Sequence, residues 1–302
     1  MNVFKNRRGF LLLAAATPLA LLEGCAKVPS GGVNNAATRY VTVTMRVAGR
    51  IRQTSEDGVP YSYFFVVNFV DDINTDSGPA PVNTFPWGNG FAAPATTPAN
   101  SQGFVGFVVF GGPQSQGQYG VYEVPIVTLD ATKGTTGPAN VATLGPGLSG
   151  FIPRGTPDNS TVPQVGGNLL TFRLNLNQFR NTFYRTETST TGTTTPRIPN
   201  YLQFNFINTD NFPQTPDPNN SSVVKTWDSL GNANSEPAPS KGIPGIVRGI
   251  PLSQTGQTYD NSTIVSINPN SVESSGDVWD KQNRNINEPD LDIVEWSVTI
   301  SS

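Results

Sequence analysis

Oxygen-bearing side chains alternate in one short segment of the sequence, in a pattern that could hold a metal ion. Asp72, Asn74 and Asp76 occupy alternate positions and precede Gly78. Calcium takes about six to eight oxygen ligands, and a D-x-[DN]-x-[DN] loop supplies three of them. Asp, Asn and Gly also form solvated turns for backbone reasons alone. The segment therefore predicts either a plain turn or a structural calcium site that a distant loop completes.

A denser acidic group lies near the end of the sequence. Glycosidases use two carboxylates that face each other about 5–10 Å apart across a cleft. The sequence shows no such partner, and Asp290 and Asp292 are spaced to share one face of a strand, as at a solvated sheet edge. We expect no catalytic residue, and a carboxylate-based hydrolase is the weakest functional alternative. The group consists of Glu288, Asp290, Asp292 and Glu295.

Three aromatic residues lie close together in a glycine-containing segment, and they form the candidate ligand-binding site. Phe85, Trp87 and Phe91 belong to the sequence FPWGNGF. Exposed rings can stack on sugars or anchor a protein interface. The alternative is a lid, in which Trp87 and Phe91 fold back over the core, because large aromatic side chains are usually well buried.

Composition excludes several kinds of site. The 302 residues include no His and a single Cys, and only 14% of them are charged. Without His, a Ser-His-Asp triad, an imidazole zinc site and a His-ligated haem are excluded. One Cys cannot form an intrachain disulfide, a Cys-cluster zinc site or an iron–sulfur cluster. We expect no cofactor, with structural calcium as the alternative.

The first 24 residues have the features of an export signal. Basic residues, including Arg7 and Arg8, precede an apolar run from Phe10 to Leu22, which is shorter than the roughly 20 residues that span a bilayer. The segment NRRGFLL resembles the twin-arginine export motif, although paired arginines also serve as generic signal charge. LEGC, which ends at Cys25, resembles the bacterial lipobox. That resemblance implies cleavage before Cys25 and acylation of its thiol, and the alternative is a buried apolar thiol.

Acylation at Cys25 would hold the mature protein on a membrane surface, since two or three acyl chains anchor stably. Residues 25–38 are small and polar and are expected to form a flexible tether. Removal of residues 1–24 takes away three basic side chains and one acidic one, which leaves a formal charge of −5. A mildly acidic chain without a basic cluster does not favour nucleic acid as a partner.

Period-two alternation of apolar residues predicts an all-β fold for residues 39–302. Four segments alternate apolar with polar residues, which indicates one buried and one solvated face: Tyr40–Ile51, Asn168–Leu176, Tyr201–Ile207 and Val294–Ile300. Two segments are apolar on both faces and suit central strands: Tyr61–Val70 and Phe104–Phe110. Further strand candidates are Tyr119–Leu129, with Pro125 at an edge or bulge, and the weaker Val223–Leu230 and Thr263–Ile267.

About eight to ten strands of this kind favour a single two-layer antiparallel β-sandwich with long loops. The alternative is a split into two domains near residue 150. Met45 falls on the face that we assign to the core.

The order of these segments resembles that of DOMON-type sandwiches and related carbohydrate-binding modules. The segments that carry the resemblance are Tyr61–Val67, Asp71–Gly78, Leu169–Leu174, Tyr201–Thr209 and Trp227–Gly231. The resemblance implies a module that binds sugars or haem on one face of the sandwich. The haem-binding members ligate iron through His and Met, and this chain offers no His.

We therefore expect a lipid-anchored protein of a bacterial cell envelope, on the periplasmic or cell-surface side of a membrane. Its sandwich is expected to bind a carbohydrate or another envelope ligand without catalysis, so a polysaccharide or an envelope protein is the expected partner. A structural role in surface assembly is the first alternative, and the hydrolase is the second.

Overall fold

The structure is a computed structural model, and it describes the following residues: 38–55, 58, 60–73, 78–79, 81–82, 91–92, 104–112, 117–130, 135–138, 147–180, 183, 185–188, 192, 194–210, 226–231, 247–280 and 289–302. From residue 38 onward they belong to one compact unit, Ala36–Ser302. Among them, no helix combines the length and the apolar character needed to cross a membrane.

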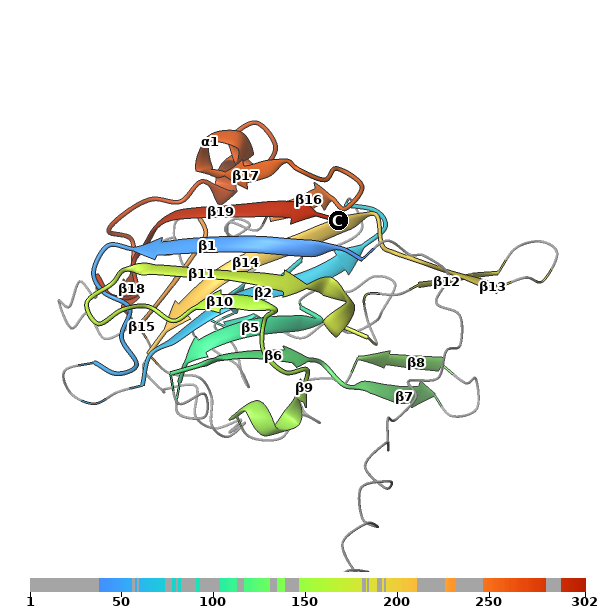
Figure 1. The fold of residues 1–302 in the computed structure, drawn as a ribbon, viewed down its shortest axis with the longest axis horizontal. Helices are drawn as coiled ribbons and strands as arrows, with labels where there is room; N and C mark the ends of the chain where they lie inside the picture. Colours follow the sequence, from blue (N-terminus) through green and yellow to red (C-terminus); the bar gives the residue numbers. More distant parts are fainter. Residues whose placement is uncertain are drawn as a thin grey trace, which may run out of the picture. The chain divides into compact units, whose positions relative to one another are not determined.

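Two antiparallel sheets pack face to face, which confirms the predicted all-β sandwich (Figure 1). The first sheet has five strands, in the spatial order β10 (Asn159–Thr161), β11 (Leu169–Asn175), β1 (Tyr40–Val47), β19 (Ile293–Ser301) and β17 (Thr258–Asp260). The first and last long strands of the described chain therefore lie side by side, with Val43 opposite Val298.

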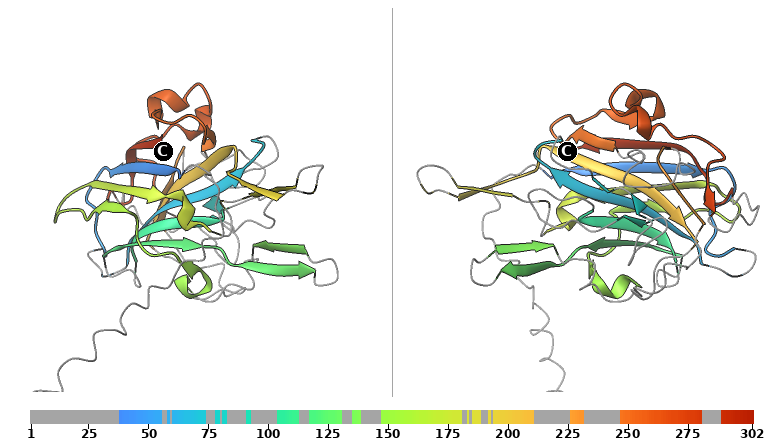
Figure 2. Two further views of the ribbon diagram at one scale, coloured as in Figure 1. Left: turned by 45° about the vertical axis from the view of Figure 1, so that its right-hand side comes forward. Right: turned by 180° about the vertical axis from the view of Figure 1, so that it is seen from behind.

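The second sheet has eight strands and lies behind the first in Figure 1, and in front in the reverse view of Figure 2. Its order is β18 (Trp279–Asp280), β15 (Thr226–Ser229), β14 (Tyr201–Thr209), β2 (Ser62–Val70), β5 (Gly106–Gly111), β6 (Tyr119–Glu123) and β9 (Ile152–Pro153), with β16 (Val247–Pro251) also paired to β14. Both sheets thus combine strands from before and after residue 150. The two sheets hold more strands than the eight to ten expected, because several are only two or three residues long.

Smaller elements complete the described chain. Three two-stranded ribbons pair β3 (Pro81–Val82) with β4 (Phe91–Ala92), β7 (Ile126–Asp130) with β8 (Thr135–Pro138), and β12 (Arg185–Thr188) with β13 (Thr194–Arg197). The helical elements are α1 (Asn261–Ile264) and the 3-10 turns η2 (Gly147–Gly150), η3 (Leu176–Gln178) and η4 (Pro269–Ser271).

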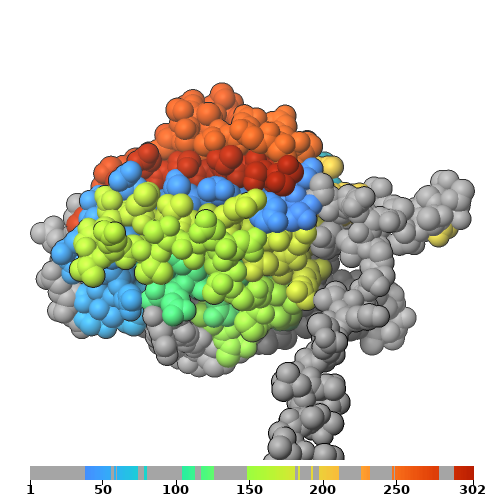
Figure 3. Space-filling view, viewed as in Figure 1, coloured from blue at the N-terminus to red at the C-terminus, as the bar shows by residue number. Residues whose placement is uncertain are grey.

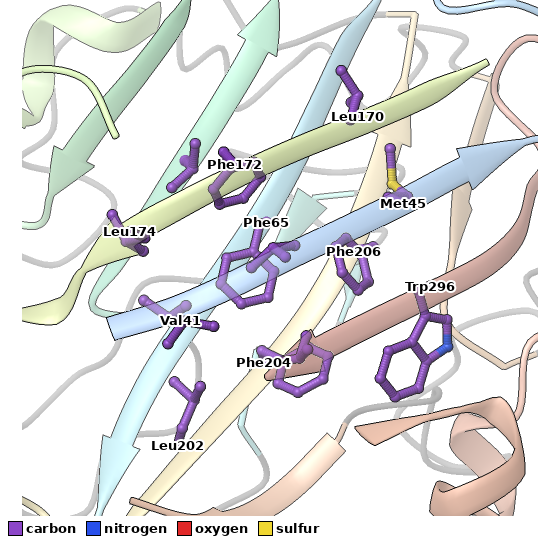
Figure 4. Close-up of a cluster of buried hydrophobic side chains, with 14 of the residues drawn as sticks. Val41, Met45, Phe65, Leu170, Phe172, Leu174, Leu202, Phe204, Phe206 and Trp296 are labelled. Carbon is purple, nitrogen blue, oxygen red and sulfur yellow. The ribbon is translucent and has the colours of Figure 1, made fainter. Parts of the chain in front are cut away.

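The main core fills the space between the sheets, where side chains from both layers point toward one another (Figure 4). Met45 lies in this core, as the alternation predicts, and is 2% exposed. The ring of Phe65 packs within 5.9 Å, centroid to centroid, of Phe172 from the opposite sheet. Phe204 likewise meets Trp296 across the layers, at 5.4 Å in an edge-to-face arrangement. Rings at these separations contribute beyond the area that they bury.

A second apolar cluster covers the other face of the eight-stranded sheet. It includes Phe64, Val66, Phe107 and Val109. Strands β2 and β5 are therefore buried on both faces, as their continuous apolar runs predict.

Three expectations about strands are wrong. Tyr201–Ile207 has no solvated face, because Gln203 is buried and accepts a hydrogen bond of 2.8 Å from Asn68. Tyr119–Leu129 is two strands in different sheets, since the pairing stops before Pro125. Thr263–Ile267 begins in α1 and continues as a turn, because the Asp260 side chain accepts hydrogen bonds from backbone N–H groups at the helix start.

Candidate metal centre and sheet surface

Three buried carboxylates from distant parts of the sequence meet at one place in the sandwich. One carboxylate oxygen each from Asp228, Glu273 and Asp277 lies within 4.8 Å of the other two. All three side chains are buried, and Glu273, the most exposed of them, is only 8% exposed. We refer to these three residues as the carboxylate cluster.

Strand β15 places Asp228 in the cluster. Asp228 is paired with Asn208 of β14, so both side chains project from the same face of the eight-stranded sheet. Phe206 lies two residues before Asn208 and belongs to the core, which identifies this face as the inner one. Oδ2 of Asp228 accepts a hydrogen bond of 2.6 Å from the backbone N–H of Ile293, the first residue of β19.

The segment after η4 places the other two members. Oε2 of Glu273 accepts a hydrogen bond of 3.1 Å from the N–H of Gly231, just beyond β15, and Oε1 accepts one of 3.2 Å from Ser274. The Oδ1 atom of Asn261 accepts a hydrogen bond of 3.0 Å from the N–H of Glu273, which fixes the segment against α1. Oδ2 of Asp277 accepts a hydrogen bond of 3.4 Å from the Ser274 hydroxyl.

Asp292 lies beside the cluster, and Asp290, two residues earlier, has a different environment. Asp290 forms an ion pair with Arg52, at 2.6 Å from Nε to Oδ2. The Asp292 carboxylate instead accepts hydrogen bonds of 2.9 and 3.0 Å from the backbone N–H of Gly276. Both aspartates precede β19 and are buried, so the expected solvated strand edge is wrong. Of the acidic group, only Glu295 is an exposed strand residue, and Glu288 lies outside the described residues.

Burial and mutual repulsion disfavour the charged forms of these carboxyls. Burial raises the pKa of Asp228 well above its usual range, and the nearby charges of Asp277 and Asp292 raise it further. Burial also raises the pKa of Glu273, with Asp228 and Asp277 adding to the effect. The pKa of Asp292 is raised by burial and lowered in part by the N–H of Gly276. The charged forms of these carboxyls are therefore disfavoured in the fold, and a proton or a cation would relieve their repulsion.

A neutral oxygen stands next to the cluster. Asn208 is fully buried, and its Nδ2 donates a hydrogen bond of 2.8 Å to the carbonyl of Leu291. Its Oδ1 is buried and accepts no hydrogen bond from the part of the chain that the structure describes. Because residues paired across two strands have Cβ atoms about 4.5–5.5 Å apart, this amide lies alongside the Asp228 carboxylate.

A second feature is the outer face of the five-stranded sheet, where hydroxyl side chains form rows across the strands. Thr44 of β1 and Ser297 of β19 share a hydrogen bond of 2.6 Å between their hydroxyls. Thr258 and Thr299 do the same at 2.8 Å. Residues of β11, β1 and β19 lie open on this surface in Figure 3.

Charged side chains of this face contact other residues of the same face. The guanidinium of Arg173 stacks over the ring of Tyr40, 3.8 Å from its centroid. Arg46 and Glu295 form an ion pair at 2.8 Å. The face is therefore rich in hydroxyls, and Arg46, Glu295 and Arg173 each contact a partner on it.

Most residues that the sequence singles out lie outside the described part of the chain. These are Arg7, Arg8, Cys25, Asn74, Asp76, Phe85 and Trp87. Asp72 is described and exposed, and Phe91 is described only as backbone in β4. The calcium turn, the aromatic site and the lipid anchor therefore stay predictions.

Sequence reasoning missed the carboxylate cluster, although it noticed Asp292 beside it. Asp228 stands alone in the segment TWDSLG, and Glu273 and Asp277 stand in ESSGD, where the sequence gives no sign of burial. Comparisons with models of protein families, with curated proteins and with solved structures found no match to this chain.

Proposed function

We propose that the protein is exported, anchored in a bacterial envelope membrane through acyl chains on Cys25, and binds a neutral envelope polysaccharide without catalysis. The outer face of the five-stranded sheet carries the binding part of this proposal. Ser and Thr hydroxyls both donate and accept hydrogen bonds, as sugar hydroxyls do. Such hydroxyls lie on the neighbouring strands β1 and β19, at Thr42, Thr44 and Thr299. Arg46 and Glu295 pair with each other and Arg173 lies over the Tyr40 ring, so the face suits an uncharged polymer better than an acidic or basic one.

The position of the clustered carboxylates supports binding over catalysis. A glycosidase needs two carboxyl groups that a substrate can reach. Asp228, Glu273 and Asp277 are at most 8% exposed, and their described hydrogen bonds are to groups of the protein itself. Such an arrangement suits a structural task inside the fold.

Co-sedimentation of the purified protein with insoluble neutral polysaccharides and with peptidoglycan tests this function. We expect the protein to pellet with a polysaccharide and to release no soluble sugar. Thr44→Arg, which places a long charged side chain on the outer face, should abolish pelleting. Ser266→Arg, at an exposed position after α1, is the control and should pellet as the wild type does.

Two results would overturn this proposal. Failure to pellet with any polymer, combined with self-association that grows with protein concentration, would favour the structural role in surface assembly. Equal pelleting of Thr44→Arg and the wild type would place the binding site elsewhere on the molecule.

A further inference from the structure

We propose that Asp228, Glu273 and Asp277 bind one calcium ion, which fastens the segment 273–277 and β15 to the start of β19. This site is separate from the polysaccharide-binding face and does not depend on it. It also differs from the calcium turn that the sequence predicts at Asp72.

The spacing of the carboxylate oxygens matches calcium. Calcium–oxygen distances are about 2.3–2.6 Å, so two ligands on opposite sides of one ion are about 4.6–5.2 Å apart. The three cluster oxygens all lie within 4.8 Å of one another, so no two of them are further apart than one calcium ion can bridge. Calcium also takes carboxylates in one- or two-oxygen contact and tolerates irregular geometry, whereas magnesium demands a near-ideal octahedron.

Asn208 gives an independent reason to place a cation here. Among the described residues, none donates a hydrogen bond to its buried Oδ1, although a buried polar atom without a partner is costly. The pairing of β14 with β15 holds this amide beside Asp228. An amide oxygen next to a carboxylate is unfavourable unless a positive charge lies between them. Side-chain amide carbonyls are ordinary calcium ligands. We therefore assign Asn208 as a neutral ligand of the same ion.

The ion would have a structural role, because its ligands connect three parts of the fold. Asp228 already contacts Ile293 of the other sheet, and Glu273 contacts Gly231 at the end of β15. Burial, together with repulsion among the cluster carboxylates, raises the pKa values of Asp228 and Glu273, and a divalent cation would offset both effects. Bound calcium should therefore stabilise this region and leave the outer face of the sheet unchanged.

The test uses the protein purified from the exporting cell and stripped with EDTA, with calcium alone and terbium alone as probes. We expect calorimetry to give one calcium ion per chain, with a Kd at or below about 1 mM. Terbium should luminesce on tryptophan excitation, since Trp227 adjoins Asp228 in β15, and calcium should quench that signal by competition. Calcium should also raise the Tm.

Variants identify the ligands. Asp228→Asn and Glu273→Gln should each weaken calcium binding by about 10- to 100-fold or more, and Asn208→Ala by a smaller factor. Glu295→Gln is the matched control, because it makes the same change at an exposed position and should leave the Kd unchanged.

Several outcomes would overturn the site. The wild type binding no calcium at 10 mM would do so, and so would equal binding by the wild type and Glu273→Gln. If Asp72→Asn abolishes binding while Glu273→Gln retains it, the ion belongs to the turn and not to the cluster. If the cluster variants do not fold, the wild-type titration and Asp72→Asn decide the question.

Discussion

The carboxylate of Asp228 accepts a hydrogen bond of 2.6 Å from the backbone N–H of Ile293, and this contact joins strands of different sheets. Its other oxygen accepts a hydrogen bond of 2.8 Å from Ser229. Both donors are uncharged, so they compensate the burial of a negative charge only in part. A carboxyl group whose charged form is disfavoured thus links the two sheets. The stability of this link is therefore expected to depend on pH.

The first prediction is that, in EDTA, the carboxylate cluster loses stabilising free energy as pH rises. The pKa values of Asp228 and Glu273 are raised in the folded state, so that state binds more protons than the unfolded chain does. Stability from these groups is therefore complete below their unfolded pKa values, about 4, and is lost as pH rises through the folded values.

Urea unfolding of the wild type and Glu273→Gln between about pH 5 and pH 8 measures this effect. A glutamine at this position does not titrate. The free energy of unfolding of Glu273→Gln, minus that of the wild type, should therefore increase with pH. A difference that stays constant with pH would show that Glu273 titrates normally in the folded protein.

The second prediction concerns the ion pair between Glu123 of β6 and Arg154, which follows β9. Glu123 is fully buried, and the Arg154 Nε donates a hydrogen bond of 2.7 Å to its carboxylate. Arg154→Met should lower the free energy of unfolding by about 3–5 kcal/mol, because it leaves a buried charge uncompensated. Chemical denaturation provides the measurement.

A double variant distinguishes the effect of losing the ion pair from the effect of leaving the Glu123 charge buried without Arg154. Glu123→Leu combined with Arg154→Met removes both partners and should recover most of the stability that Arg154→Met loses. If the double variant is as unstable as the single one, the loss arises from packing of the arginine stem and not from the charge.

The third prediction concerns Phe65, which contacts aromatic rings of both layers. Its ring lies within 5.9 Å of Phe172 and 5.2 Å of Phe206, centroid to centroid. Phe65→Ala should cost about 3–5 kcal/mol, because the surrounding rings cannot close the cavity. Val165→Ala, at a fully exposed position, should change stability by less than about 0.5 kcal/mol. Comparable losses in both variants would contradict the assignment of the core.

The sequence predicted strands correctly where the alternation of apolar and polar residues matches the alternation of buried and exposed side chains in the structure. In β1, Val41, Val43, Met45 and Val47 alternate with residues of the outer face, and the structure buries all four in the core. The predicted solvated face of Tyr201–Ile207 is wrong because Gln203 and Asn205 are buried, where Gln203 accepts a hydrogen bond from Asn68 and Asn205 donates one to the carbonyl of Pro79. Whether a polar strand face meets water or another layer depends on distant segments, which a local pattern does not contain.

The carboxylate cluster shows the same limit more strongly. Asp228 and Glu273 become neighbours only because β15 and the segment after η4 both approach the start of β19. The short helix α1, in contrast, had a local signal, because Asp260 and Thr263 form a capping box. The apolar residues of Thr263–Ile267 instead led to the prediction of a strand at this position.

The fourth prediction concerns Gly106, which begins β5 and has no room for a side chain. A Cβ at this position would lie 2.4 Å from Cε1 of the Phe179 ring and 2.9 Å from the backbone carbonyl of Tyr122. Gly106→Ala should therefore lower the free energy of unfolding by about 1–3 kcal/mol, because the buried ring or the strand must shift. In a Phe179→Leu background the same change should cost less, and an equal cost in both would show that the strand backbone is the limiting contact.

The fifth prediction concerns the membrane anchor. If cleavage before Cys25 and acylation of its thiol occur, the wild type should fractionate with membranes, and mass spectrometry should find an N-terminal cysteine carrying two or three acyl chains. Cys25→Ser removes the only thiol of the chain and should release the protein from the membrane fraction. Because no described element of the sandwich depends on residue 25, this variant should keep the Tm and the calcium affinity of the wild type. Membrane retention of Cys25→Ser, or an intact unmodified terminus in the wild type, would contradict the anchor and leave the proposals for the sandwich to be judged separately.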